Sequence, residues 1–339
     1  MKAQATVIIT TRDRPEMLGE ALQSVRLQTW AAAIKQVIVS ENGATEASRN
    51  ICEQFGDLPL CYLRQNPPVS SLLHLKALWH HVDTPLVAIL HDDDWWGPRH
   101  LENALGTLEK HPECVATYSN FLDTYGPTVV PFLSEKAWRV WVSSGCDFSP
   151  PLLMLDKVGV LLACLLNSTF HYSTLVGRKE AIWATYLKMV AEDNAWDNER
   201  TFPVFLSAQG PIGYLTSHAA FIRNHPAQEG FDAAFRAKGF GEMRVKTTRW
   251  LARLDPNDTK LAVARFNHSV KTLRPELVSI VSGQIEEPQR SVLIKELRLN
   301  LVPSPESSKK WLLKQLCPPV VLALRRKVKG TGRKLAAKK

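Results

Sequence analysis

Three consecutive acids, Asp92, Asp93 and Asp94, directly follow the apolar run LVAIL at residues 86–90. Carboxylates this close repel one another, and a position beside an apolar run adds a desolvation penalty for each charge. Something must offset that charge. Mg²⁺ and Mn²⁺ bind hard oxygen ligands and keep positions open for the oxygens of a phosphate. The acids are therefore either a divalent metal site or a solvated turn that caps the helix after Pro98.

Alternating strand and helix patterns explain how the chain positions these acids. Short apolar, β-branched runs predict strands over 5–10, 35–44, 60–66, 85–91 and 113–120. Helical spacing of apolar residues predicts helices over 15–29, 71–82 and 100–112, the first of them with Pro15 at its opening position. Such alternation predicts an α/β fold with a doubly wound, mostly parallel sheet flanked by helices. Ligands of these sheets bind beyond the carboxyl ends of the strands, where the acids lie.

The second half of the chain is less regular. We predict irregular structure over 121–150, then a helix, a short strand over 173–178 and a second helix from Lys179. A further helix ends at Gly210 and is followed by one or two strands over 211–226. The predicted divisions are two halves of one domain, a helical C-terminal extension and a basic tail, at residues 1–120, 121–227, 228–302 and 303–339.

The positive charge of the chain is concentrated at its end. Residues 309–339 carry eleven Lys and Arg and no acid, so the remaining 308 residues sum to −2 although the whole chain is at +9. The tail alternates apolar stretches with cations, which is typical of a segment on an anionic membrane surface, of a nucleic-acid binder or of a frayed end. Because the body is slightly acidic, we expect no nucleic acid as a partner, and of the remaining alternatives we favour the membrane surface.

Other features indicate a cytoplasmic protein. The most apolar stretch, residues 158–167, is far shorter than the roughly 20 residues of a membrane span, and we predict a buried helix there. The six cysteines form no CxxC pair, which predicts reduced thiols. The N-terminal segment lacks the apolar core of a signal peptide.

No glycine-rich phosphate loop follows the first strand, so a nucleotide would be held by side chains at strand ends and by a metal. Four blocks carry a resemblance: VIITTRDRPEMLGEALQSVRLQT, QVIVSENGATEAS, LRQN and VAILHDDDWWGPRHLENAL. Their order and spacing resemble the nucleotide-binding half of inverting glycosyltransferases of family 2, with a GT-A fold. The resemblance covers residues 5–120 strongly and 165–226 moderately.

The resemblance implies a nucleotide-diphosphate-sugar donor and a bound Mn²⁺ or Mg²⁺. It places donor contacts at Thr11, Arg14, Glu41, Lys76, Asp92 and Asp94. Glu41 stands where the family usually has Asp, and Lys76 is the cation nearest to a position where the family often has Arg. Asp93 is the implied metal ligand, and His225 of the block IRNHP is a second one.

An inverting transfer also needs a general base that takes the proton of the acceptor hydroxyl. The resemblance places a carboxylate before the helix that ends at Gly210. Its spacing favours Asp197, with Glu199, Asp193 and Glu192 as alternatives, and an ordinary acidic helix start would explain these acids equally. Two further pairs stay open: Ser173 and Thr174 as acceptor contacts, and Trp95 and Trp96 as a sugar-stacking surface or as core.

These implications predict an inverting hexosyltransferase that adds a sugar to a growing glycan or lipid-linked acceptor of a bacterial surface polysaccharide. It would work in the cytoplasm, peripherally at the inner face of the plasma membrane. Two alternatives remain: a non-catalytic nucleotide-sugar-binding protein of the same fold and a nucleotidyltransferase. The second is disfavoured, because a triphosphate normally needs the glycine-rich loop that TTRDRP lacks.

Overall fold

The structure is a computed structural model of the chain. It describes residues 4–69, 71–126, 128–131, 152–157, 159–160, 170–191 and 198–225. The predicted helical extension and basic tail lie outside these residues, and so do most of the apolar stretch 158–167 and the acids Glu192, Asp193 and Asp197. Among the described residues, no helix combines the length and the apolar character that crossing a membrane requires.

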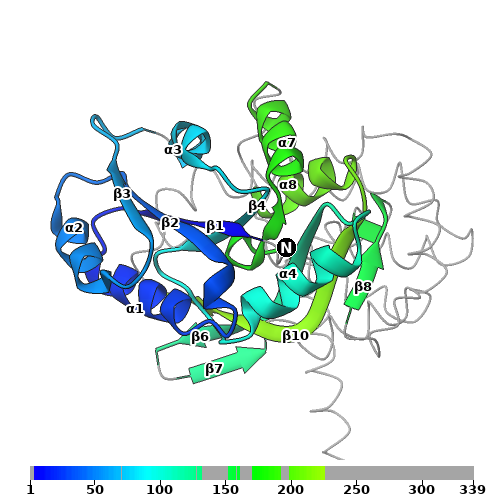
Figure 1. Ribbon diagram of the computed structural model, residues 1–339, viewed down its shortest axis with the longest axis horizontal. Coiled ribbons are helices and arrows are strands. Elements are labelled where there is room, and N and C mark those ends of the chain that lie inside the picture. The colour runs from blue at the N-terminus through cyan, green and yellow to red at the C-terminus, as the bar shows by residue number, and fades with distance from the viewer. Residues whose placement is uncertain are drawn as a thin grey trace, which may run out of the picture. The chain divides into compact units, whose positions relative to one another are not determined.

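A mixed, mostly parallel sheet runs through the described chain (Figure 1). Its principal strands are β1 (Ala5–Thr11), β2 (Ile34–Glu41), β3 (Leu60–Arg64), β4 (Leu86–His91), β9 (Val176–Arg178), β6 (Ala116–Tyr125) and β10 (Ile212–Arg223). They lie in the order β3-β2-β1-β4-β9-β6-β10. Parallel pairing joins β3, β2, β1 and β4, and it also joins β6 to β10. Strand β9 is antiparallel to both β4 and β6, so it links the two parallel groups.

Three short strands complete the sheet. β5 (Trp95–Trp96) and β8 (Leu152–Leu155) pair antiparallel with β10, and β7 (Thr128–Pro131) pairs antiparallel with β6. Together with β9, their antiparallel pairing makes the sheet mixed. The α/β prediction of a mixed, mostly parallel sheet flanked by helices is therefore confirmed.

The helices form where the sequence places apolar residues at helical spacing. α1 (Pro15–Arg26) begins with a proline at its first position and buries Leu18, Ala21, Leu22 and Val25 along one stripe. α4 (His100–Lys110) buries Leu101, Ala104, Leu105 and Leu108 in the same way. The other α-helices of the described residues are α2 (Ala47–Cys52), α3 (Ser71–Leu78), α7 (Lys179–Ala191) and α8 (Asn198–Ser207).

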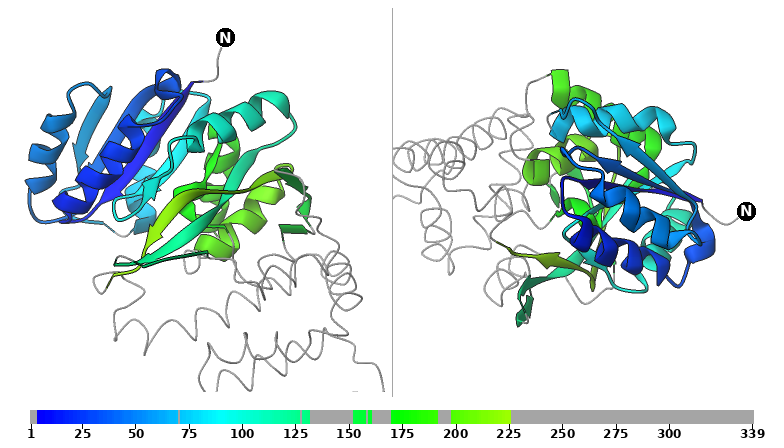
Figure 2. Two further views of the ribbon diagram at one scale, coloured as in Figure 1. Left: turned by 90° about the horizontal axis from the view of Figure 1, so that it is seen from below. Right: turned by 90° about the vertical axis from the view of Figure 1, so that its left-hand side faces the viewer.

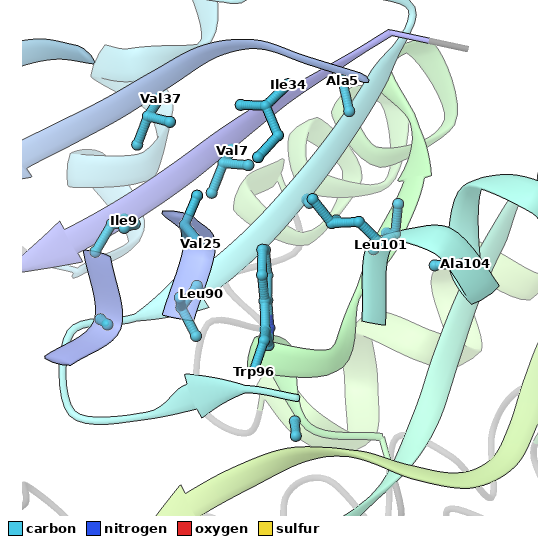
Figure 3. Packing of buried hydrophobic residues seen from close by; sticks show 14 of the residues in the cluster. Ala5, Val7, Ile9, Val25, Ile34, Val37, Leu90, Trp96, Leu101 and Ala104 are labelled. Carbon is cyan, nitrogen blue, oxygen red and sulfur yellow. The ribbon is translucent and has the colours of Figure 1, made fainter. Parts of the chain in front are cut away.

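Each face of the sheet carries its own apolar core. Successive strand residues point to opposite faces, so Ile8 and Ile89 pack with α3, α7 and α8, whereas Ile9 and Leu90 pack with α1 and α4. Figure 2 shows the helices on the two faces, and Figure 3 shows Trp96 among the side chains of the second core. Both cores hold β4 in place, and the three acids directly follow the end of this strand.

The structure corrects several predicted elements. Residues 121–125 continue β6 and 128–131 form β7 where irregular structure was predicted, and 152–155 form the strand β8 in place of a helix. Ser173 and Thr174, predicted to start a strand, lie in the short 3₁₀ turn η4 (Tyr172–Thr174). Helix α2 was not predicted. Strand β8 is fixed by its pairing with β10, a contact remote in sequence.

Candidate active site

The carboxyl ends of neighbouring strands meet at one edge of the sheet. In the register of the strands, Thr10 pairs with His91, and Thr11 pairs with Glu41. Glu41 in turn pairs with Arg64 at the end of β3. The acids after His91 therefore come directly beside the turn that follows β1. This is the edge at which parallel sheets bind ligands.

Asp92 is held by the turn after β1. Its Oδ2 accepts a hydrogen bond from Thr11 Oγ1 at 2.7 Å and a longer one from the Arg12 backbone N–H at 3.4 Å. Its Oδ1 accepts from Arg14 Nη1 at 3.1 Å. Burial raises the pKa of Asp92 above its usual range, although the neighbouring Arg14 opposes the rise. The predicted donor contacts Thr11, Arg14 and Asp92 are thus brought together, bonded to one another.

Asp93 shares the same arginine. Arg14 Nη1 lies 2.9 Å from Asp93 Oδ2, and His225 Nε2 lies 3.1 Å from the same oxygen. Burial would raise the pKa of Asp93, but His91, Arg14 and His225 together hold it below its usual range. The repulsion between the first two acids is therefore balanced by a guanidinium group that bridges them.

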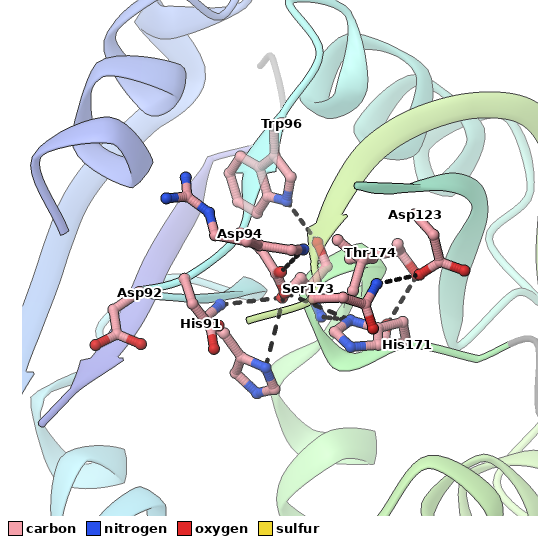
Figure 4. Close-up of polar contacts among 12 residues, drawn as sticks. His91, Asp92, Asp94, Trp96, Asp123, His171, Ser173 and Thr174 are labelled. Carbon is pink, nitrogen blue, oxygen red and sulfur yellow. Dashed lines mark hydrogen bonds and ion pairs between the residues drawn. The ribbon is translucent and has the colours of Figure 1, made fainter. Parts of the chain in front are cut away.

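Asp94 is slightly more buried than its two neighbours, and its side chain lies beside Ser173 (Figure 4). Its side chain is 1% exposed, Ser173 Oγ donates to its Oδ2 at 2.5 Å, and the Arg223 backbone N–H donates to its Oδ1 at 2.9 Å. Burial, reinforced by the charge of Asp93, raises the pKa of Asp94 to about 7. Its position is that of an internal anchor for the loop, whereas the sequence suggested a contact with the donor sugar or a supporting role.

Ser173 connects this loop to η4. Besides its bond to Asp94, its Oγ accepts the His91 backbone N–H at 3.1 Å, and its carbonyl accepts the indole N–H of Trp96 at 2.5 Å. Ser173 and Thr174 are both fully buried, which does not favour the predicted acceptor contact. Trp96 is core, whereas the partly exposed Trp95 stacks on Phe221 at 5.3 Å between ring centroids.

Glu41 is buried at the end of β2 and bound internally. Its Oε1 accepts the Asp13 backbone N–H at 3.1 Å, and its Oε2 accepts from Ser48 Oγ at 2.5 Å. Asp13 adopts a left-handed backbone conformation with φ 54°, and its carboxylate accepts the backbone N–H groups of Ala44 and Thr45. Glu41 therefore orients the turns after β1 and β2, and its predicted contact with the base stays a prediction.

Lys76 lines a groove together with residues near the start of β4, the end opposite to the acids. It is exposed, and the groove has a volume of about 460 Å³ and is also lined by Trp79, His80, Lys179, Glu180 and Trp183. The backbone N–H of Lys179 bonds to Pro85 at the start of β4, whereas the acids follow its end. The buried polar side chain of α3 is instead His74, whose Nε2 lies 2.7 Å from Ser40 Oγ. The predicted donor contact of Lys76 thus finds no support in its position.

The structure brings the two predicted metal ligands, Asp93 and His225, together. The carboxylate oxygen and the imidazole nitrogen of His225 lie close enough to face one ion, and mixed oxygen and nitrogen ligands suit Mn²⁺. Arg14 contacts that oxygen as well, so an ion would have to displace its guanidinium. Of the predicted bases, only Glu199 falls in a described element, the first turn of α8, and its side chain is outside the description.

Sequence reasoning missed the residues that hold Asp94. His171 Nδ1 lies 3.7 Å from Asp94 Oδ2, and the backbone of Arg223 donates to the same carboxylate. Their only signal in the sequence is the polar run HYST, which interrupts an apolar segment before β9. Nothing local connects that run to an acid 79 positions earlier.

Comparisons with known proteins agree with this geometry. Residues 6–149 match the family model "Glycosyl transferase family 2". The structure is similar to that of S. aureus TarS 1-349 in complex with UDP-GlcNAc, with TM-score 0.58, 13% identity and coverage of 88% of this chain and 82% of that one. It is also similar to the mannosyltransferase PcManGT from Pyrobaculum calidifontis in complex with GDP-Man and Mn²⁺, with TM-score 0.51, 14% identity and coverage of 89% and 81%.

A search of curated proteins found no match. At 13–14% identity the two structures speak for the fold alone, and they confirm the expected GT-A-like architecture. The family model adds a sequence match over residues 6–149. The block that it matches contains the β1 turn, the end of β2 and all three acids, which are the elements that build the site. Over these residues, which make up less than half of the chain, the protein is similar to glycosyl transferase family 2.

Proposed function

We propose that the protein transfers a hexose from a nucleotide-diphosphate-sugar to a hydroxyl of a growing glycan or lipid-linked acceptor, with inversion and with a divalent metal. The observation that carries the proposal is the placement of Asp92 and Asp93. They follow β4 at the carboxyl edge of the sheet and are bonded to the turn after β1, in a block similar to glycosyl transferase family 2. The complexes of the two similar structures, with UDP-GlcNAc and with GDP-Man, support a nucleotide-sugar donor.

The side chains at this edge have distinct tasks in the proposal. Thr11 and the Arg12 backbone hold the Asp92 carboxylate in one orientation, so it meets the donor preorganised. Arg14 is 26% exposed and supplies a positive charge beside both acids. When the donor arrives, this guanidinium can turn from the acids to the diphosphate. Mn²⁺ or Mg²⁺ at Asp93 and His225 would neutralise charge on the leaving diphosphate.

Deprotonation of the acceptor falls to an acid before α8 or in its first turn. Asp197 is our first candidate for the general base, and Asp193 and Glu199 are the alternatives. A carboxylate there would accept the hydroxyl proton as the oxygen attacks the anomeric carbon, which inverts that centre in a single displacement. Replacing each acid by its amide separately, with Glu192→Gln as a comparison, identifies the base as the variant that keeps donor binding and loses transfer.

Turnover of a donor panel tests the proposal. Purified protein is incubated with UDP-, GDP- and dTDP-sugars with and without Mn²⁺, and release of nucleoside diphosphate is followed. We expect one donor to turn over with metal, and NMR of the transferred sugar to show the opposite anomeric configuration. If no donor is bound or hydrolysed and Asp93→Ala changes nothing, the proposal fails.

The same assay separates the alternatives. A non-catalytic binding protein would bind a donor without turnover, and Asp197→Asn would have no effect on it. A nucleotidyltransferase would release pyrophosphate from a nucleoside triphosphate in the presence of a sugar phosphate. One observation supports the non-catalytic alternative. The Glu41 carboxylate is already bonded to the Asp13 backbone N–H and to Ser48 Oγ, and not to a nucleotide base.

We further propose that the basic tail binds an anionic membrane surface on the cytoplasmic side, where a lipid-linked acceptor would be found. Flotation of the full chain with phosphatidylglycerol vesicles tests this proposal. Replacing Arg325, Arg326, Lys327 and Lys329 by Gln should abolish flotation, because each cation near such a surface contributes about 1 kcal/mol. Equal flotation of both proteins would remove the membrane role.

A further inference from the structure

Two histidines converge on the buried end of the acidic run. His91 Nδ1 lies 3.9 Å and His171 Nδ1 lies 3.7 Å from Asp94 Oδ2. All three atoms lie within 4.8 Å of one another. Two ligands of a tetrahedral ion with bonds of about 2.1 Å are roughly 3.4 Å apart. A small inward movement would therefore bring the three atoms onto one ion.

We infer that His91, Asp94 and His171 form a second metal site, separate from the one at Asp93 and His225. This second site takes a borderline divalent ion such as Zn²⁺. Imidazole nitrogens with one carboxylate oxygen are a usual donor set for Zn²⁺ and related transition metals, whereas Mg²⁺ prefers oxygen ligands. This inference does not rest on the proposed sugar transfer, because it concerns ligands that the donor site does not use.

The ring nitrogen of His171 is in the form that a metal requires. The backbone N–H of Ser173 donates to His171 Nδ1 at 3.2 Å, so this nitrogen carries a lone pair and no proton. A metal ligand must be deprotonated in the same way. The hydrogen bond from Ser173 to His171 Nδ1 is long. A bound cation would replace it and coordinate the lone pair of Nδ1.

Packing and hydrogen bonds already hold all three side chains. His91 stacks on Tyr172 with ring planes 16° apart, and the ring of His171 packs on Phe121 at 5.5 Å. Ser173 contacts every member, through its Oγ to Asp94, through the His91 backbone N–H and through its own N–H to His171. Such supporting contacts orient metal ligands and lower the reorganisation that binding requires.

The site also has an open side. The side chain of His91 is 39% exposed, while those of His171 and Asp94 are 15% and 1% exposed. An ion can therefore enter past His91, and positions that the protein does not fill remain for water. Asp123 lies beside His171 (Figure 4) and adds negative charge near the imidazole. A bound ion would join the end of β4 to the residue that precedes η4, in addition to the contacts that Tyr172 and Ser173 already make.

Metal titration of the full chain, stripped with a chelator, tests the inference. Co²⁺ is the spectroscopic probe and Zn²⁺ the competitor, with visible d–d absorption as the readout. We expect one site at which His91→Ala and His171→Ala each weaken binding by at least about tenfold. The exposed His80 provides the matched control, and His80→Ala should bind like the wild type. Because His91 is partly exposed, its variant should fold even if His171→Ala does not.

The double variant Asp93→Asn with His225→Ala separates this site from the donor site. It should keep the Co²⁺ spectrum and the Zn²⁺-induced rise in melting temperature, while Mg²⁺ produces no such rise. Wild-type binding in both His91→Ala and His171→Ala would overturn the inference. So would loss of all Co²⁺ binding in the double variant, which would assign the ion to Asp93 and His225.

Discussion

The run of three aspartates has two sides that differ in their bonding partners. Asp92 and Asp93 share the partly exposed Arg14, and Asp92 is also bonded to the turn after β1, about eighty residues away, while Asp93 also contacts His225. Asp94 is bonded to Ser173 and Arg223, which come from the second half of the chain. The pKa of Asp93 lies below its usual range, whereas burial raises that of Asp94 to about 7. The surroundings of Asp93 and Asp94 thus give two neighbouring residues of the same type different pKa values.

The difference indicates a division of labour between the two sides. A carboxylate that shares a partly exposed cation suits a ligand-binding group. A carboxyl group with both oxygens bonded inside the protein suits a structural anchor. Variants that affect one side and spare the other can break or sharpen this comparison.

Loss of the Asp93 charge should produce the largest effect. We expect Asp93→Asn to lower kcat/KM for the donor by about 100–1000-fold, as removal of a group that stabilises transition-state charge does. The fold should be retained, because Asn has the same shape and the site is at the sheet edge. Donor turnover and the melting temperature measure the two effects.

Asp83→Asn is the matched control, because Asp83 is an exposed acid that precedes β4 at the opposite end. It should leave both activity and stability unchanged. Similar activity of the two variants would mean that Asp93 has no part in catalysis.

Removal of the cation between the first two acids should come next. Arg14→Met leaves two buried carboxylates without their shared partner, which should destabilise the fold by roughly 1–3 kcal/mol, less than for a fully buried pair because Arg14 is 26% exposed. Mn²⁺ should restore part of the loss, since an ion that binds only the folded state stabilises it. Urea unfolding with and without Mn²⁺ measures both.

The pair Arg26–Asp57, with side chains 44% and 50% exposed, gives a comparison. Arg26→Met should cost less than about 1 kcal/mol and respond to no metal. Equal effects of Mn²⁺ on the two variants would contradict a metal at Asp93.

The buried side should respond through stability. Ser173→Ala removes the O–H that donates to Asp94, and a buried acceptor left without its donor costs about 1–3 kcal/mol. Because Ser173 and Asp94 form one network, the effect of Ser173→Ala should shrink in an Asp94→Asn background. A double-mutant cycle by urea unfolding measures the coupling. Strict additivity would show that the short contact contributes nothing.

The smallest effect concerns His100, which packs against Trp96 at 4.5 Å between ring centroids. Both its ring nitrogens are buried without a hydrogen-bond partner, and burial lowers its pKa to about 3. The folded state keeps His100 neutral, while the unfolded chain takes a proton near pH 6.5. Protonation of His100 in the unfolded chain therefore costs no folding stability above about pH 6.5. Below that pH the free energy of unfolding declines as the pH falls towards 3.

His100→Phe should raise the unfolding free energy by about 1 kcal/mol near neutral pH. It should also flatten the decline of stability between pH 6.5 and 5, while His111→Phe, at a partly exposed position, keeps the wild-type slope. Thermal unfolding across this pH range measures the slopes. An unchanged slope in His100→Phe would mean that the ring is already solvated.

The nucleotide-binding half of the fold could be predicted from the sequence because its signals are local. Alternating and helical apolar patterns locate β1 to β4, α1 and α4 within a few residues, and the polar residues after each strand follow directly. Strand β8 reads as part of a helix because LLML is equally apolar in either form. Its pairing with β10 decides the matter, and that contact spans about sixty residues.

The site divides in the same way. Asp92, Asp93 and Thr11 could be identified because they follow adjacent strands. The interaction of Ser173 and His171 with Asp94 could not, since it depends on β9 entering between β4 and β6. The donor contacts of Lys76 and Glu41 stay predictions, because a matching place in the chain does not fix where a side chain points.

Calorimetric titration of the preferred nucleotide-sugar, with Mn²⁺ present, into wild type, Asp93→Asn and Ser173→Ala tests the central claim most directly. We predict that Asp93→Asn loses donor affinity by at least about tenfold, while Ser173→Ala, once shown to be folded, binds within a few-fold of wild type. Wild-type affinity in Asp93→Asn, or loss of binding in folded Ser173→Ala alone, would contradict the division between a donor-binding side and a buried anchor.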